Sequence, residues 1–587
     1  MTLFKSMFAG ALCAACFSAA AATPAQQINA LADRYYMAQA HFDPVGATSY
    51  GDNRFDDELT MTVNPAVRAR QLAMLHEVQN DLMAIDRSKL AGLDLSSYDI
   101  LAAEVHALLA LEPFKDYLLP LNQMDGLPAT LANLAGGQSS QPIGTVAEYD
   151  KFLKRIAQLP QWVDAAIAAM RSGMASGIVQ PKAIVVALLP QLKTMAAASV
   201  EQSDFSTPIR QFPAGFGAGD KARLTGAYRN EVQGRTLPAL RKLAAFVEHD
   251  YLPAARATAG LGALPNGAAW YRAWVQVQTT TTMSPDQIHA LGLAEMARIT
   301  AELAKLGPRL GYTGEPMGLM RWLKQQPHNL PFKSDAEVLD AYRALNARIV
   351  KRLPELFATL PKSALEIRPE PELTRDAASD HYSAGSSDGK RPGVFWAVIT
   401  DPKKYDTTHM TTLFLHEAQP GHHFQVSKQL ELAIPDFRRF SPNNAYIEGW
   451  ALYAETLGRE MGLYDDANAY AGHLMYDMVR AARLVVDTGL HAKGWTREQT
   501  IAFLVEKAGA GDDEARNATE RYMAWPGQAL GYKIGALKIM ELRQRAQAAL
   551  GPKFKLARFH DAILAEGPLP LALLETTMTA WIASEAK

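Results

Sequence analysis

The residues best suited to chemistry in this chain are three histidines and a glutamate gathered in one short segment. Residues 416–423 read HEAQPGHH. In the zinc motif HExxH, two histidines four residues apart lie on one helix face, and the glutamate after the first histidine activates the attacking water. His416 and Glu417 begin such a motif here, but Pro420 stands where the second histidine should be. We therefore expect a zinc site of altered geometry.

Pro420 and Gly421 decide which histidines can meet. On a regular helix His416 and His423 would lie about 10 Å apart along the axis, at a rise of about 1.5 Å per residue, which is too far for one ion. Proline cannot continue the hydrogen-bond ladder and glycine accepts unusual dihedral angles, so we expect a local excursion that returns His422 to the position of the second ligand. We predict His416 and His422 as metal ligands, with His423 as the alternative to His422.

A third ligand is expected downstream, where residues 445–455 read AYIEGWALYAE. Glu448 is flanked there by apolar residues, and a carboxylate is costly to bury unless it is paired or bound to metal. We predict that Glu448 completes a site for one Zn²⁺ per chain and that Glu455 has a supporting or structural role. The alternative is that both are surface glutamates on an amphipathic helix, although Trp450 and its apolar neighbours leave little polar face.

Four polar residues share one face of the helix expected between residues 476 and 491. Arg480, Arg483, Asp487 and His491 follow one another at helical spacing, and the rest of the segment is apolar. If this helix is enclosed, the polar face should line a wet cavity, where arginine can hold a peptide carboxylate through two hydrogen bonds. We predict Arg480, Arg483 and Arg521 as substrate-binding residues and His491 as an aid to oxyanion stabilisation. The alternative is a solvated face with internal ion pairs.

Tyr532 follows a glycine-rich turn, because residues 526–532 read PGQALGY. A tyrosine hydroxyl placed by such a turn can stabilise the oxyanion of a hydrolytic reaction, and the alternative is a core tyrosine whose hydroxyl is satisfied. With Glu417 as the base that takes the proton from the attacking water, the sequence predicts a zinc-dependent peptidase acting on peptides or peptide-like molecules. The alternatives are a non-catalytic binding or scaffold protein, and a metal-dependent amidase acting on a non-peptide substrate.

The elements that must position these residues are mostly helices. From residue 27 to about residue 360 the pattern is helical, with long stretches at 150–172 and 222–247. Ser284, Pro285 and Gln287 form a helix start with a capping box, and the helix should run to about Leu306. Strands are expected only between residues 361 and 404, chiefly at 394–399, where a short β element could pair with an extended peptide at its edge.

Composition excludes several classes of protein. The chain has 587 residues with 48% hydrophobic and 20% charged residues, which is ordinary for a globular protein. A net charge of −2 supplies no basic surface for nucleic acid. No segment after the leader reaches the 18 or so apolar residues of a transmembrane helix, so we expect no transmembrane anchor.

The first 22 residues read as a signal peptide, with Lys5, an apolar core and a small-residue cleavage site before Thr23. We expect a periplasmic or secreted protein. The two cysteines, Cys13 and Cys16, both lie in this leader; lipid anchoring through Cys16 is the alternative, which Cys13 disfavours because it fits poorly at that position of a lipobox. We expect an N-terminal helical region at 23–375 and a metal-binding catalytic region at 376–587, joined in one continuous cleft-forming unit.

Several motifs together resemble one bacterial family. HEAQPGHHFQ and IEGWALYAE, followed by DTGLHAKGW and PGQALGYKIG, are similar to the family called domain of unknown function 885, and SGIVQPKAIV, LPNGAAWYRAWV and FHDAILAEGPLPL extend the likeness over nearly the whole mature chain. The resemblance implies a mainly α, large helical zincin-like fold with a small β element near the active-site cleft. It also implies a metallohydrolase distantly similar to oligopeptidase and angiotensin-converting-enzyme types. The Pro-Gly insertion departs from those peptidases and leaves His422 and His423 as alternatives.

Overall fold

Helices make up most of the chain, and the prediction of a mainly α protein is confirmed. The computed structural model describes residues 22–136, 140–372, 375, 379–386, 389, 391–440 and 443–587. The described residues form long and short helices with one small sheet between α16 and α17. Residues 1–21 of the predicted signal peptide lie outside this part of the chain. None of the described helices is long and apolar enough to cross a membrane.

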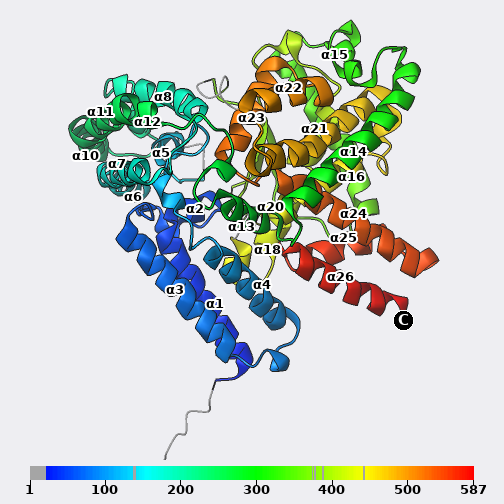
Figure 1. The fold of residues 1–587 in the computed structure, drawn as a ribbon, viewed down its shortest axis with the longest axis horizontal. Coiled ribbons are helices and arrows are strands. Elements are labelled where there is room, and N and C mark those ends of the chain that lie inside the picture. The colour runs from blue at the N-terminus through cyan, green and yellow to red at the C-terminus, as the bar shows by residue number, and fades with distance from the viewer. Residues whose placement is uncertain are drawn as a thin grey trace, which may run out of the picture.

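The first half of the chain forms two groups of helices (Figure 1). In the first group α1, α3 and α4 pack side by side, and in the second α11 packs on α7 and α8. The bounds are α1 (Pro24–Phe42), α2 (Pro44–Ser49), α3 (Pro65–Ala84), α4 (Gly92–Leu109), α5 (Leu127–Ala135), α6 (Val146–Ile156), α7 (Leu159–Ser176), α8 (Lys182–Ala197), α9 (Thr207–Arg210), α10 (Ala218–Glu231), α11 (Leu237–Phe246) and α12 (Leu252–Ala254).

Two long helices expected in this half differ in continuity. The stretch 150–172 is divided between α6 and α7, because a new helix begins at Leu159 with Pro160 in its first turn. Proline is tolerated there, since the N–H groups of the first turn have no partner within the helix in any case. The stretch 222–247 is almost unbroken, since a π-helical turn (Val232–Thr236) joins α10 to α11.

The second half carries the expected metal-binding segments. Its helices are α13 (Gly267–Thr279), α14 (Pro285–Leu306), α15 (Leu319–Leu323), α16 (Asp335–Leu356), α17 (Met410–Glu417), α18 (His422–Glu431), α19 (Asp436–Arg439), α20 (Asn444–Thr456), α21 (Ala467–Ala492), α22 (Arg497–Ala508), α23 (Asp512–Ala524), α24 (Leu530–Leu550), α25 (Leu556–Leu564) and α26 (Leu571–Ala586). The helix predicted from Ser284 to Leu306 is confirmed as α14, with its capping box formed by Ser284 and Gln287.

The sheet has three strands in the order β1-β3-β2. β1 (Leu365–Pro369) pairs parallel with β3 (Gly393–Ala397), and β2 (His381–Ser383) pairs antiparallel with it. β3 is buried throughout, as expected for a central strand. The small β element is therefore confirmed, but the expected peptide pairing at residues 394–399 is wrong for β3, because both of its edges are already taken.

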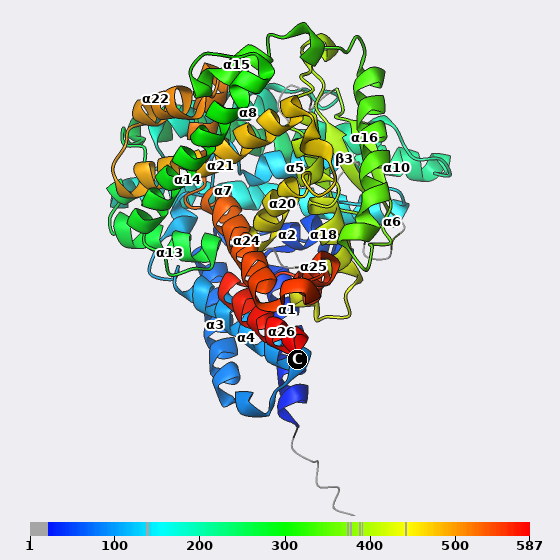
Figure 2. The same ribbon diagram turned by 90° about the vertical axis from the view of Figure 1, so that its right-hand side faces the viewer.

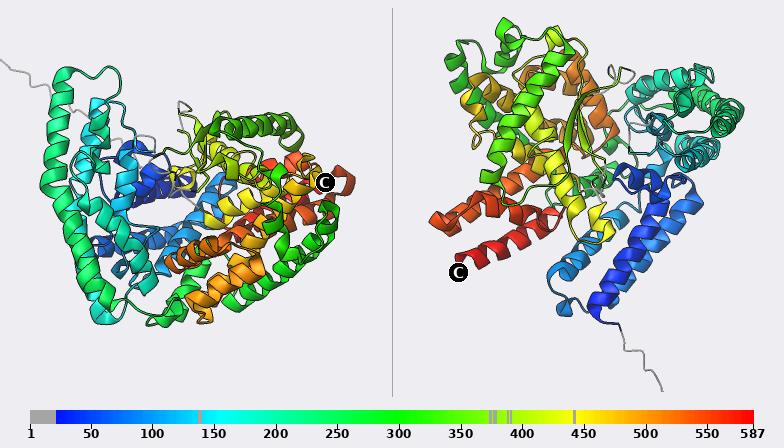
Figure 3. Two further views of the ribbon diagram at one scale, coloured as in Figure 1. Left: turned by 90° about the horizontal axis from the view of Figure 1, so that it is seen from above. Right: turned by 180° about the vertical axis from the view of Figure 1, so that it is seen from behind.

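The long helices of the second half form the frame of the expected site. α20 packs along α24, and α21 packs along α14 (Figure 2). α14 and α16 precede residue 376, yet they pack against α21 and α17, which follow it. The packing therefore does not separate at the expected boundary. Seen from above, the first half of the chain forms one side of the molecule and the second half the other (Figure 3); they meet where α1 packs on α19 and Arg54 pairs with Asp436 at 2.8 Å.

Candidate metal centre

A break in the chain brings His416 and His422 together. α17 ends at Glu417, Ala418 and Gly421 leave the helical region with ψ of −103° and −125°, and α18 begins at His422. A Cβ on Gly421 would lie 1.9 Å from the carbonyl oxygen of His416, so only glycine fits there. The indole nitrogen of Trp450 donates a hydrogen bond of 2.9 Å to the carbonyl oxygen of Pro420. The expected excursion is thus the end of one helix and the start of another.

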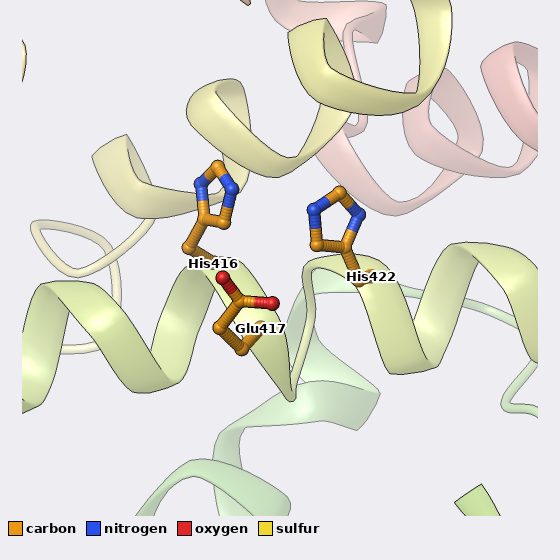
Figure 4. Close-up of side chains that lie close together, drawn as sticks. All are labelled: His416, Glu417 and His422. Carbon is orange, nitrogen blue, oxygen red and sulfur yellow. The ribbon is translucent and has the colours of Figure 1, made fainter. Parts of the chain in front are cut away.

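The two imidazole rings lie on the same side of this break (Figure 4). Their centroids are 4.8 Å apart and their planes are nearly perpendicular, at 86°. Glu417 lies beside them, and one ligand atom from each of the three residues falls within 4.8 Å of the others. The side chains of His422 and Glu448 are 13% and 18% exposed, so both keep some contact with solvent.

Glu448 on α20 faces both rings. Its Oε2 lies 3.5 Å from Nε2 of His416 and 3.4 Å from Nε2 of His422. In a tetrahedral zinc site with bonds of about 2.0–2.1 Å, neighbouring ligand atoms lie about 3.4 Å apart. The same Oε2 is buried and has no hydrogen-bond partner, so a cation between the three atoms would satisfy it. The three side chains fit the donor set of a zinc ion, and Glu417 remains beside them as a fourth polar group.

The charges at this site favour a cation. Burial would raise the pKa of Glu448, but the facing imidazoles of His422 and His416 hold it well below its usual value. Burial would lower the pKa of His416, but the carboxylates of Glu448 and Glu455 raise it to about 9. A divalent ion can replace the ring proton between these carboxylates, so its binding should release protons.

Glu455 orients the first histidine. Its fully buried carboxylate lies 2.8 Å from Nδ1 of His416. A carboxylate accepts hydrogen bonds, so Nδ1 carries a hydrogen, and Nε2 can offer its lone pair to a cation once the second ring proton has been released. Glu455 thus has the supporting position expected from the sequence.

His423 points away from this cluster. It is buried, and its Nδ1 lies 3.3 Å from the hydroxyl of Tyr382 on β2. Burial lowers its pKa to about 4, so the ring is neutral. The structure therefore brings His422, not its rival His423, to the other predicted ligands.

Tyr532 lies beside the first histidine, as a role in oxyanion stabilisation requires. Its ring is nearly parallel to that of His416, with centroids 6.4 Å apart. Its hydroxyl accepts hydrogen bonds from Arg521 at 3.1 Å and Gln528 at 3.4 Å. Burial and the charge of Glu448 raise its pKa, so the hydroxyl keeps its hydrogen. No acceptor among the described residues takes that hydrogen, which leaves it free for a substrate.

The polar face of α21 is enclosed, but most of it does not reach this cluster. Both ring nitrogens of His491 bond to backbone, Nδ1 to the N–H of Leu261 and Nε2 to the carbonyl oxygen of Tyr522, each at 2.9 Å. His491 therefore has no free nitrogen for oxyanion stabilisation, and we withdraw that assignment. The alternative of a solvated face is also wrong, since Arg480, Asp487 and His491 are buried.

Arg480 and Asp487 support other parts of the site. Arg480 faces Glu455 at 3.6 Å and lies over the ring of Tyr476. It therefore supports Glu455, the carboxylate that orients His416, and is not placed to bind substrate. The carboxylate of Asp487 accepts hydrogen bonds from the Tyr271 hydroxyl at 2.5 Å and from the N–H of Gly527 at 3.1 Å. It thereby fixes the turn before Tyr532.

Of the predicted substrate-binding residues, Arg483 and Arg521 lie next to Tyr532. The guanidinium carbon of Arg483 is 4.4 Å from the centroid of the Tyr532 ring. Sequence reasoning missed Trp450 as the residue that fixes the chain break and Gln528 as a donor to Tyr532. The only local signal for Gln528 was its place in the glycine-rich turn, four residues before the tyrosine.

Comparisons with known proteins identify relatives of this fold and the family of the chain. The chain resembles the crystal structure of a candidate lipoprotein from Colwellia psychrerythraea, with a TM-score of 0.89, 30% identity, and 96% of this chain and 100% of that chain covered. A candidate lipoprotein of unknown function from Shewanella oneidensis shares the fold, with a TM-score of 0.73, 19% identity, and 95% and 100% covered. No curated protein matches. The model of the family described as "Bacterial protein of unknown function (DUF885)" matches residues 44–578. The chain therefore belongs to the DUF885 family of bacterial proteins.

Proposed function

We propose that the protein is a zinc-dependent hydrolase that cleaves peptide bonds. The observation that carries this proposal is the convergence of one buried carboxylate oxygen of Glu448 on Nε2 of His416 and of His422, at 3.5 and 3.4 Å. Three protein ligands with an accessible fourth position are typical of catalytic zinc, whereas structural zinc takes four protein ligands.

The chain's own residues then divide the reaction between them. His416, His422 and Glu448 would hold the zinc ion, which when bound would supply an activated water and polarise the substrate carbonyl. Glu417 takes the proton from the attacking water and passes it to the leaving amine. The Tyr532 hydroxyl, held by Arg521 and Gln528, donates its hydrogen to the developing oxyanion. Glu455 keeps His416 in the required tautomer and orientation.

Elemental analysis of the purified mature protein, prepared without added metal, tests the metal site. We expect about one zinc per chain in the parent protein and loss of zinc in His416→Ala. His423→Ala is the matched control, because that ring faces Tyr382 and should leave zinc bound. Absence of zinc from the parent, with no uptake on addition, would contradict the proposal and favour the binding or scaffold protein.

A substrate panel tests the reaction. Cleavage of free peptides, with cell-wall fragments left intact, supports a peptidase. Cleavage of the wall fragments alone would instead support the amidase, since both reactions use the same water and the same oxyanion support.

We propose an extracytoplasmic location, which the predicted leader supports. The similar proteins from Colwellia psychrerythraea and Shewanella oneidensis are described as candidate lipoproteins, so lipid attachment at Cys16 is the alternative to cleavage before Thr23. Cell fractionation distinguishes the two. A periplasmic protein unaffected by Cys16→Ser supports cleavage, whereas release from the membrane fraction in that variant supports lipid attachment.

A further inference from the structure

Arg483 is a charged residue that lacks a charged partner. None of the ion pairs among the described residues involves Arg483, and its hydrogen bond at 3.3 Å goes from Nε to the hydroxyl of Tyr522. Its Nη1 is buried and has no hydrogen-bond partner. Leaving such a group unsatisfied is costly unless another molecule accepts a hydrogen bond from it.

Arg155 and Arg438 are buried arginines that donate several hydrogen bonds, although Nε of Arg438 also has no hydrogen-bond partner. Arg155 donates to three carbonyl oxygens, to Gln141 and to Thr48. Arg438 donates to backbone carbonyl oxygens and faces Glu566 at 3.5 Å. Arg483 differs from them because its hydrogen bond goes to a tyrosine hydroxyl, and no carbonyl oxygen or carboxylate of the described residues accepts a hydrogen bond from it.

Arg483 lies close to the predicted reaction centre. Its guanidinium lies over the ring of Tyr532, and that ring is next to His416. Burial would lower the pKa of Arg483, but nearby groups, the carboxylate of Glu448 among them, raise it. Arg521 donates a hydrogen bond to the hydroxyl of the same tyrosine. It also has no carboxylate partner among the described residues, and its Nε is buried and has no hydrogen-bond partner. Two arginines thus present unused donors beside the predicted reaction centre.

We propose that Arg483, assisted by Arg521, binds the free C-terminal carboxylate of the substrate, so that the enzyme removes residues from the C-terminal end of peptides. A planar guanidinium matches a carboxylate through two parallel hydrogen bonds. This inference rests on the proposed peptidase function. The developing oxyanion already has a donor in Tyr532, so the arginine donors remain for a second, permanent negative charge on the substrate.

The test uses the zinc-loaded Glu417→Gln protein, which should bind peptides without cleaving them. It is immobilised and exposed to a library of N-acetylated tripeptides with free C-terminal carboxylates, mixed with the same library as C-terminal amides. Mass spectrometry measures which peptides are retained. We expect the acids to be retained at least about tenfold better than the amides, as expected for a charge-assisted hydrogen-bonded pair.

Two further variants on the same background assign the effect. Arg483→Gln should reduce the preference for acids to less than about twofold while zinc stays bound, which elemental analysis checks. Arg235→Gln is the matched control, because Arg235 is an exposed residue that pairs with Glu231 at 3.1 Å, and it should keep the full preference.

Equal retention of acids and amides, retention of neither, or a preference that persists in Arg483→Gln would overturn the inference. The first two outcomes are measured on the Glu417→Gln protein alone, so they test the inference even if Arg483→Gln does not fold. Parallel incubation of the unmodified enzyme with both libraries separates the two proposals. Cleavage of acids and amides alike overturns the carboxylate site and leaves the peptidase, whereas selective retention of acids without any cleavage overturns the peptidase and leaves the carboxylate site.

Discussion

Glu417 and Glu448 are carboxylates beside the same pair of imidazoles, and their surroundings assign them different tasks. Glu448 places one oxygen at nearly equal distances from both rings, where a shared cation would satisfy it. Glu417 is in the same cluster but belongs to the last turn of α17, next to the break. One is therefore suited to hold the ion and the other to move a proton.

Glu417→Gln should separate these tasks. Because the amide cannot take a proton but leaves the three ligands in place, we expect turnover to fall by about 100-fold to 10,000-fold while zinc content is unchanged. Steady-state kinetics and elemental analysis measure the two effects. Glu506→Gln, at an exposed position on α22, is the control and should keep full activity. Full activity in Glu417→Gln would show that another group is the base.

At this scale the sequence predicted residue types well and partners less well. His416 and His422 are close in sequence, so helix geometry and the Pro-Gly break were enough to predict that they meet, whereas Glu448 was singled out by its apolar flanks. His491 and Asp487 were correctly expected on one enclosed face, but their partners Leu261 and Tyr271 lie more than 200 residues away. Long-range packing decides which of the four polar residues on this face lack a partner within the protein, and local sequence patterns carry no information about that packing.

Among the elements, the junction of α17 and α18 is the one on which the site depends. Gly421→Ala should weaken zinc binding although every ligand is retained, because its Cβ would collide with the carbonyl oxygens of His416 and Leu415. We expect at least a tenfold loss of zinc affinity, equal to about 1.4 kcal/mol, measured by competition with a chelator. Gly219→Ala on α10, where nothing lies within 4 Å, is the control. Unchanged affinity would mean that the junction can shift at no cost.

The turn that carries Tyr532 should respond to pH through Asp487. Burial raises the pKa of Asp487 from 3.8 to about 7, and hydrogen bonds from Tyr271 and Gly527 offset only part of that. A raised carboxyl pKa favours the folded state at low pH, and this advantage is lost as pH rises from about 4 to about 7. Asp487→Asn has no such dependence, so the unfolding free energy of the parent should fall relative to the variant over that range. Denaturant titrations between pH 4 and 8 measure this difference, and parallel curves would contradict it.

Elements with strong local signals were predicted correctly. The Ser284 capping box predicted the start of α14 correctly, because the signal lies within a single turn, and the expected end at about Leu306 is also confirmed. The break between α6 and α7 was missed, since the alanine-rich pattern continues through it and Pro160 is compatible with the first turn of a new helix. The strands were placed correctly, but their order was not predictable from local patterns, and β3 proved to be the central strand.

For the whole molecule, a bound ion should act as a clamp between helices. The three ligands come from α17, α18 and α20, and α20 packs in turn along α24. Zinc that binds only the folded protein should add about 2.7 kcal/mol to the unfolding free energy at a free concentration 100 times the dissociation constant. Thermal unfolding with and without a chelator measures the effect.

Glu448→Gln is the matched variant for this measurement. It removes a charged ligand and should make the unfolding temperature insensitive to the chelator, whereas Glu506→Gln should behave as the parent does. If the unfolding temperature of the parent does not change when zinc is removed, the ion does not stabilise the packing of these helices, whatever the catalytic result.

The order of these elements along the chain has a consequence for synthesis and export. All three predicted ligands are present once residue 448 has been made, but Tyr532 and the helix that covers α20 come later, from Leu530 onward. A chain that stops before α24 would contain a complete set of ligands and expose Trp450, Leu452 and Tyr453, which are buried in the finished protein. Fragments of this kind should aggregate and be readily degraded. The last helices are therefore needed for a stable site although they supply none of its predicted ligands.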